Sequence, residues 1–153
     1  MRRRASLCRH FLLPVPAQFA VLLAAALATG QAAADDWPAL RAGLWEFNRT
    51  IETVGAQGKP ETMQTRKCTN PSDDMKRQND MLTKSGCKFS PVTRAGNTYS
   101  YSAVCKLQGA SGTSKSVLTV ESDAAYEIRI ESDFGGEPTR ELLRAKRAGD
   151  CRP

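Results

Sequence analysis

A two-residue alternation near the end of the chain is the feature that most constrains its fold. Apolar and charged side chains alternate through residues 126–131, and Phe134 continues the apolar parity. Side chains of a strand point to opposite faces in turn, so the pattern predicts a strand with one buried and one solvent-facing side. The residues expected to face inward are Tyr126, Ile128, Ile130 and Phe134.

Other segments repeat this pattern more weakly, and turn residues separate them. Together they predict a mainly β fold, either a single antiparallel sheet or an open barrel of about six or seven strands. The last segment fits helix or strand, and we favour a strand because Cys151 must return to the sheet. The segments are residues 43–54, 61–68 (polar on both faces and suited to an edge), 87–93, 97–107, 115–122, 124–134 and 139–151.

One segment has the period of a helix. Asn70 is a good capping residue, Pro71 fits the first helical position, and acidic residues follow in the first turn. Apolar side chains then recur at helical spacing as far as Leu82. We therefore expect one short helix from Pro71 to Leu82, whereas residues 35–42 are typical of a linker.

The first 34 residues have the three parts of a secretory signal peptide. Basic residues come first, the apolar run from Phe19 to Ala28 follows, and Ala32–Ala34 supplies small residues for cleavage. The apolar run has ten residues, whereas a membrane-spanning helix needs about 20. We predict a signal peptide at residues 1–34, one domain at residues 35–153 with no transmembrane segment, and a periplasmic location.

Charge and histidine content exclude several classes of function. Cleavage after Ala34 removes four of the 22 basic residues and none of the 16 acidic ones, which leaves a net charge of +2 on 119 residues. Such a weak charge does not indicate nucleic-acid binding. Cleavage also removes His10, the only histidine, and with it the commonest general base and metal ligand. We expect neither a cofactor nor a metal site.

Four cysteines remain in the predicted mature chain, and in an oxidising compartment they indicate two disulfides. A hairpin centred on Gly96 would place Cys87 opposite Cys105, within disulfide reach. Cys68 would then pair with Cys151 by elimination. The rival pairing, Cys68 with Cys87 and Cys105 with Cys151, stays open because hairpin register alone separates the two.

Signals of catalysis are sparse. Ser85 and Lys88 match the spacing of a Ser–Lys hydrolase, but Gly86 would break the helix on which the two must share a face. Acidic residues are scattered, with no evident pair for a carboxylate-based hydrolase. We therefore expect a small binding or interaction protein without catalytic activity, and either kind of hydrolase is the less favoured alternative.

Six aromatic residues on the predicted inner faces allow two interpretations. They could hold a small apolar ligand at the mouth of a curved sheet, which would make the protein a carrier. They could instead fill the core, which would leave an interaction partner such as an envelope protein. The residues are Trp45, Phe47, Tyr99, Tyr101, Tyr126 and Phe134.

An ordered set of short motifs resembles a bacterial family known as domain of unknown function 3617. The motifs are Gly43–Glu46 ("GLWE"), Cys68 followed by a short helical segment, a hairpin from Cys87 to Cys105 around Gly96–Asn97, and the terminal Gly149–Cys151 ("GDC"). The resemblance covers about the whole predicted mature chain. It implies an exported, periplasmic protein of bacteria with a Gram-negative type of envelope, and it implies no activity.

Overall fold

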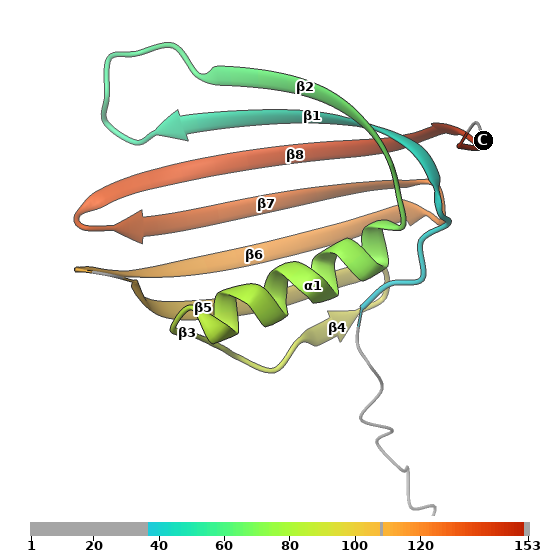
Figure 1. The fold of residues 1–153 in the computed structure, drawn as a ribbon. Coiled ribbons are helices and arrows are strands. Elements are labelled where there is room, and N and C mark those ends of the chain that lie inside the picture. The colour runs from blue at the N-terminus through green and yellow to red at the C-terminus, as the bar shows by residue number, and fades with distance from the viewer. Residues whose placement is uncertain (1–36, 108, 152–153) are drawn as a thin grey trace, which may run out of the picture. The chain divides into compact units, whose positions relative to one another are not determined.

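The computed structural model describes residues 37–107 and 109–151, so the predicted signal peptide lies outside the described residues. These residues form one open antiparallel sheet with a single helix across one face (Figure 1). The strands follow the order β2-β1-β8-β7-β6-β5-β3, and β4 pairs with β5. The elements are β1 (Gly43–Thr53), β2 (Glu61–Thr69), α1 (Pro71–Lys84), β3 (Cys87–Phe89), β4 (Thr93–Ala95), β5 (Thr98–Leu107), β6 (Ala110–Ser122), β7 (Ala125–Phe134) and β8 (Glu137–Gly149).

The mainly β prediction is confirmed, but the described residues contain eight strands instead of six or seven. The additional strand arises where the segment after Cys87 divides into β3 and β4. Pro91 lies in this gap and has no backbone N–H to donate to a ladder, which accounts for the break. The last segment is the strand β8, and β2 is an edge strand. The helix begins at Pro71 as predicted and ends two residues late, at Lys84.

The core lies on the face of the sheet that carries the predicted apolar parity. Trp45 and Leu118 are fully buried at its centre, and Met75 of α1 packs against it. The indole N–H of Trp45 donates to the carbonyl of Arg41 at 2.9 Å, which satisfies its one donor. The buried members of this cluster are Leu40, Trp45, Tyr99, Leu118, Tyr126, Ile128 and Ala145.

The segment before β1 packs on the protein, and the expectation of a linker there was wrong. Leu40 belongs to the core, and its backbone N–H donates to the Ser72 hydroxyl at 2.9 Å. The same hydroxyl donates to the carbonyl of Pro38 at 2.5 Å. Two hydrogen bonds therefore fix this segment to the first turn of α1, where the Asn70 side chain caps the Ser72 N–H at 3.1 Å.

The structure brings the four cysteines together in the pairing that hairpin register favoured. Cys87 lies directly opposite Cys105 in the ladder between β3 and β5. Cys68, near the end of β2, pairs with Cys151, two residues after β8.

Among the residues that the structure describes, no helix has the length and apolar character needed to cross a bilayer.

Candidate functional site

A cavity of about 270 Å³ lies between α1 and the face of the sheet that the helix covers. Ala103, Ser114 and Ser132 pair with one another in a row across β5, β6 and β7. These small side chains line the cavity at positions where larger inward residues would fill it. Ligand pockets commonly enclose about 300–1,000 Å³, so this volume is just below that range.

Aromatic rings form part of the cavity wall. Tyr101 is at their centre, because Trp37 meets it edge-on with ring centroids 5.3 Å apart and Phe89 lies at 6.3 Å. All three residues and Phe134 line the cavity. Trp37 reaches this position because hydrogen bonds between Ser72 and the residues after Trp37 hold that segment in place.

An ion pair faces the same cavity. Arg49 Nε lies 2.8 Å from Glu141 Oε1, and both residues line the cavity from β1 and β8. The glutamate side chain is 17% exposed and the arginine side chain 42%. The arginine N–H does not point along this contact, so Glu141 Oε1 is buried without a hydrogen bond among the described residues. Among the described residues that line this cavity, these two are the only charged ones.

The polar groups near this ion pair are hydrogen-bond donors and acceptors rather than further charges. Burial raises the pKa of Tyr101; a hydrogen bond with Ser116 opposes that rise, and the charge of Glu141 adds to it. Tyr101 is therefore a neutral phenol at ordinary pH. On the helix side, Gln78 and Asn79 also line the cavity, and Asn79 Oδ1 is buried with no partner among the described residues.

The six predicted aromatic residues separate into two groups. Tyr101 and Phe134 line the cavity. Trp45, Tyr99 and Tyr126 are buried in the main core instead. Phe47 is partly buried and packs against that core.

Sequence reasoning missed most of the described lining of the cavity, including Trp37, Arg49 and Glu141. A signal for one of them was present, because Arg49 occupies the same parity as Trp45 and Ile51 in the first strand. A charged side chain on an apolar parity needs a partner on the inner face, and Glu141 is that partner. Trp37 was missed because its segment has the composition of a linker.

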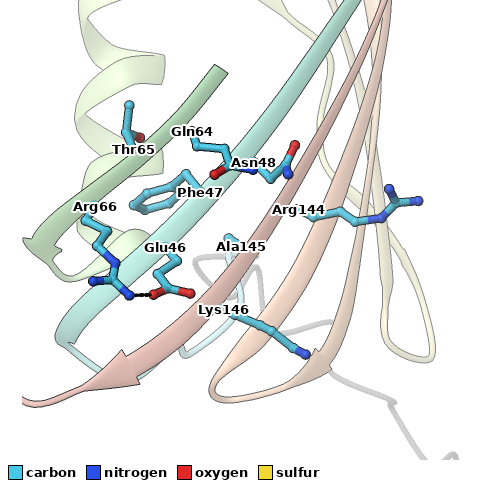
Figure 2. Close-up of a pocket in the computed structure, with 9 residues that line it drawn as sticks. All are labelled: Glu46, Phe47, Asn48, Gln64, Thr65, Arg66, Arg144, Ala145 and Lys146. Atoms are coloured by element: carbon cyan, nitrogen blue, oxygen red, sulfur yellow. Dashed lines mark hydrogen bonds and ion pairs between the residues drawn. The ribbon is translucent and has the colours of Figure 1, made fainter. Parts of the chain in front are cut away.

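A larger hollow, of about 620 Å³, lies over β2, β1 and β8. Figure 2 shows Arg66 in contact with Glu46, and Arg144 pointing away from Phe47. Arg144 is paired outside the hollow, with Glu127 at 2.9 Å. Most of the residues that line this hollow have long polar side chains of the solvent-facing parity, and among them Glu46 and Arg66 pair with each other. Its size therefore reflects gaps between surface side chains, and the smaller cavity is the better candidate site.

The Ser–Lys alternative has little geometric support. The Ser85 hydroxyl donates to the carbonyl of Met81 at 2.9 Å at the end of α1. Lys88 is exposed on β3, beside the buried Cys87. Within residues 37–107 and 109–151, no three Cys, His, Asp or Glu side chains gather in a group that could hold a metal ion.

Comparison with known proteins places nearly all of the described residues in one family. Searches of curated proteins and of solved structures found no match. The family described as "Protein of unknown function (DUF3617)" matches residues 40–151, which include every strand, the helix and all four paired cysteines. The chain belongs to the DUF3617 family.

Proposed function

We propose that this protein is an exported binding protein, without catalytic activity, that holds a small amphipathic molecule in the cavity between α1 and the sheet. The observation that carries this proposal is the ion pair between Arg49 and Glu141 in a cavity lining that also includes aromatic rings. The Glu141 side chain is 17% exposed, and moving a charge out of water costs free energy that an apolar side chain would not require. Charged groups at a partly aromatic cavity are typical of a site that orients a ligand.

Export to the periplasm is part of the proposal. The N-terminal sequence pattern of a signal peptide supports it, as does the pairing of all four cysteines outside that segment. N-terminal sequencing of the exported product should give a chain that begins at or within two residues of Asp35. A product that starts at Met1 in the membrane fraction would contradict export.

Native mass spectrometry of protein purified from the periplasm tests the binding function. We expect a complex heavier than the polypeptide, and the added mass should be lost on denaturation. Replacing Ser114 by Phe would fill the cavity and should abolish the added mass, because Ser114 is in its lining. The matched control is Thr113→Phe, on the opposite face of the same strand, which should retain the added mass.

Equal loss of the added mass in both variants would assign the bound molecule to another surface. Circular dichroism and thermal unfolding of both variants show whether each has folded. Wild-type protein that shows no added mass and also binds no added aromatic probe, such as 2-naphthol, would contradict the proposal.

A further inference from the structure

Two buried oxygen atoms of the cavity lining lack a hydrogen-bond donor. They are Glu141 Oε1, from β8, and Asn79 Oδ1, from α1, and both residues line the cavity. Among the described residues, no other buried side-chain nitrogen or oxygen atom lacks a partner. Buried polar groups are nearly always hydrogen-bonded in folded proteins, so two exceptions at one cavity indicate an occupant.

Both of these oxygen atoms need a hydrogen-bond donor. Both orphan atoms are acceptors, one on a carboxylate and one on an amide carbonyl. Arg49 does not satisfy the carboxylate oxygen, although its Nε lies 2.8 Å away, because its N–H points elsewhere. A ligand carboxylate that approached Arg49 would meet the charge of Glu141 at the same place, which disfavours an anion.

We propose that the molecule held in this cavity has an apolar body and a hydrogen-bond donor group, either an amine or a hydroxyl. The apolar body contacts the rings of Trp37, Phe89 and Tyr101, and the donor group bonds to Glu141 Oε1 or to Asn79 Oδ1. This inference rests on the proposed binding function and adds the chemical class of the ligand. An amine gains in addition from the negative charge of Glu141, whereas a hydroxyl gains only the hydrogen bond.

Four probes with the same aromatic body and different head groups test the proposal. Naphthalene, 2-naphthol, 2-naphthylmethylamine and 2-naphthoate are titrated into the mature protein, and dissociation constants are measured by calorimetry or ligand-observed NMR. We expect 2-naphthol and the amine to bind at least about tenfold more tightly than naphthalene or 2-naphthoate, the effect of one hydrogen bond to a charged acceptor.

Variants then locate the effect. Glu141→Met keeps the length of the side chain and removes the acceptor, so the affinity of the amine should fall about tenfold, to that of naphthalene. Glu131→Met is the matched control on the solvent-facing side of β7, where that glutamate is 70% exposed, and it should change nothing. Asn79→Leu removes the helix acceptor and provides a second test if Glu141→Met does not fold.

The outcomes separate this inference from the binding function. Equal affinity for all four probes, abolished by Ser114→Phe, would overturn the donor preference and leave the cavity as a binding site. Preference for 2-naphthoate would also overturn it and would assign the dominant role to Arg49. If no probe binds but native mass spectrometry shows an added mass, the inference is wrong and the binding function stands. If no probe binds and no mass is added, both are wrong.

Discussion

The two cysteine pairs differ in almost every physical respect. Cys87 and Cys105 are 2% and 5% exposed, lie opposite each other in a ladder and pack in a small cluster beside the cavity. Cys68 and Cys151 are both exposed and lie at the ends of strands that are not neighbours. The first pair reinforces contacts that the hairpin and core already make, whereas the second provides a connection that the sheet lacks.

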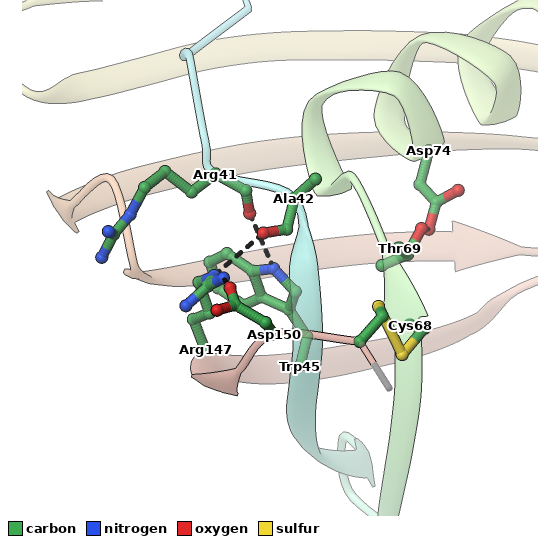
Figure 3. The surroundings of a disulfide bond; sticks show 9 residues. Arg41, Ala42, Trp45, Cys68, Thr69, Asp74, Arg147 and Asp150 are labelled. Atoms are coloured by element: carbon green, nitrogen blue, oxygen red, sulfur yellow. Dashed lines mark hydrogen bonds and ion pairs between the residues drawn. A yellow bond between two sulfur atoms is a disulfide. The ribbon is translucent and has the colours of Figure 1, made fainter. Parts of the chain in front are cut away.

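The surroundings of the exposed pair show what that connection does. Strand β2 is hydrogen-bonded only to β1, and it leads directly into α1. The bond from Cys68 to Cys151 fastens this edge strand to the chain beyond β8, on the other side of β1 (Figure 3). Arg147 supports the same corner, since its Nε donates to the carbonyl of Ala42 at 2.9 Å and its guanidinium contacts Asp150. The exposed disulfide therefore helps to hold the helix over the cavity.

The largest expected effect comes from removing the exposed pair. The two cysteines are separated by 83 positions, and closing a loop of this length in the unfolded chain stabilises the fold by about 4.5 kcal/mol. The double variant Cys68→Ser with Cys151→Ser should lose about that free energy of unfolding, measured by urea denaturation. A loss below about 1 kcal/mol would show that this pair does not restrain the unfolded chain.

Removing the buried pair should lose less stabilisation from restriction of the unfolded chain than removing the exposed pair, but it should also disturb packing in the core. The separation of 18 positions corresponds to about 3 kcal/mol, and Cys87→Ala with Cys105→Ala should lose at least this much in the same urea assay.

Thiol labelling of native protein in a mild reductant compares how easily the two disulfides are reduced. Cys68 and Cys151 should be modified first, because the other two sulfurs are accessible only after the structure opens. Simultaneous labelling of all four cysteines would contradict this order.

The smallest effect concerns a carboxylate next to the exposed pair. Asp74 accepts hydrogen bonds from Thr69 at 2.5 Å and Lys67 at 3.0 Å, and it contacts Arg77. Burial alone would raise the pKa of Asp74, but these bonds and the charge of Lys67 together lower it below its usual value of 3.8. The carboxylate therefore stabilises the fold above about pH 4, and this stabilisation is lost as the pH falls through the lowered pKa.

Replacing Asp74 by Asn should reduce the free energy of unfolding by about 1 kcal/mol at pH 7. The difference between variant and wild type should shrink as the pH falls below 4, which urea titrations at several pH values would measure. Asp73→Asn is the matched control, because Asp73 lies in the same helical turn and its side chain has no hydrogen-bond or ion-pair partner among the described residues. A difference that stays constant down to pH 2 would exclude the ionised carboxylate as its cause.

The hairpin at Gly96 shows why the pairing could be predicted and why its detail could not. The turn consists of Gly96 and Asn97, since Ala95 pairs with Thr98. That register, continued along the strand, would place Cys87 opposite Lys106. The register shifts by one residue between β4 and β3, and this shift brings Cys87 opposite Cys105. The hairpin is centred between Gly96 and Asn97 instead of on Gly96, and the register then shifts by one residue. These two departures from the prediction cancel, so the predicted partner of Cys87 was right.

The cavity was harder to predict than the sheet, because it depends on a row of inward positions that have small side chains instead of large ones. Alternation identified the inner faces correctly, and so it located Tyr101 and Phe134. It could not indicate that Ala103 and Ser114 would leave space, because a small inward residue gives no signal in one strand. The space appears only when neighbouring strands align small residues in the same row.

The position of β1 has a consequence for how the protein reaches this structure. This first strand lies between β2 and the last strand, β8, and Leu44 pairs with Gly149 from near the other end of the chain. A chain whose final 13-residue strand has not yet emerged leaves both β1 and β7 without their shared neighbour. Pairings so distant in sequence close large loops, so folding is slow compared with that of a helical bundle of similar length. The sheet is therefore completed only after β8 is available to pair with both of its neighbours.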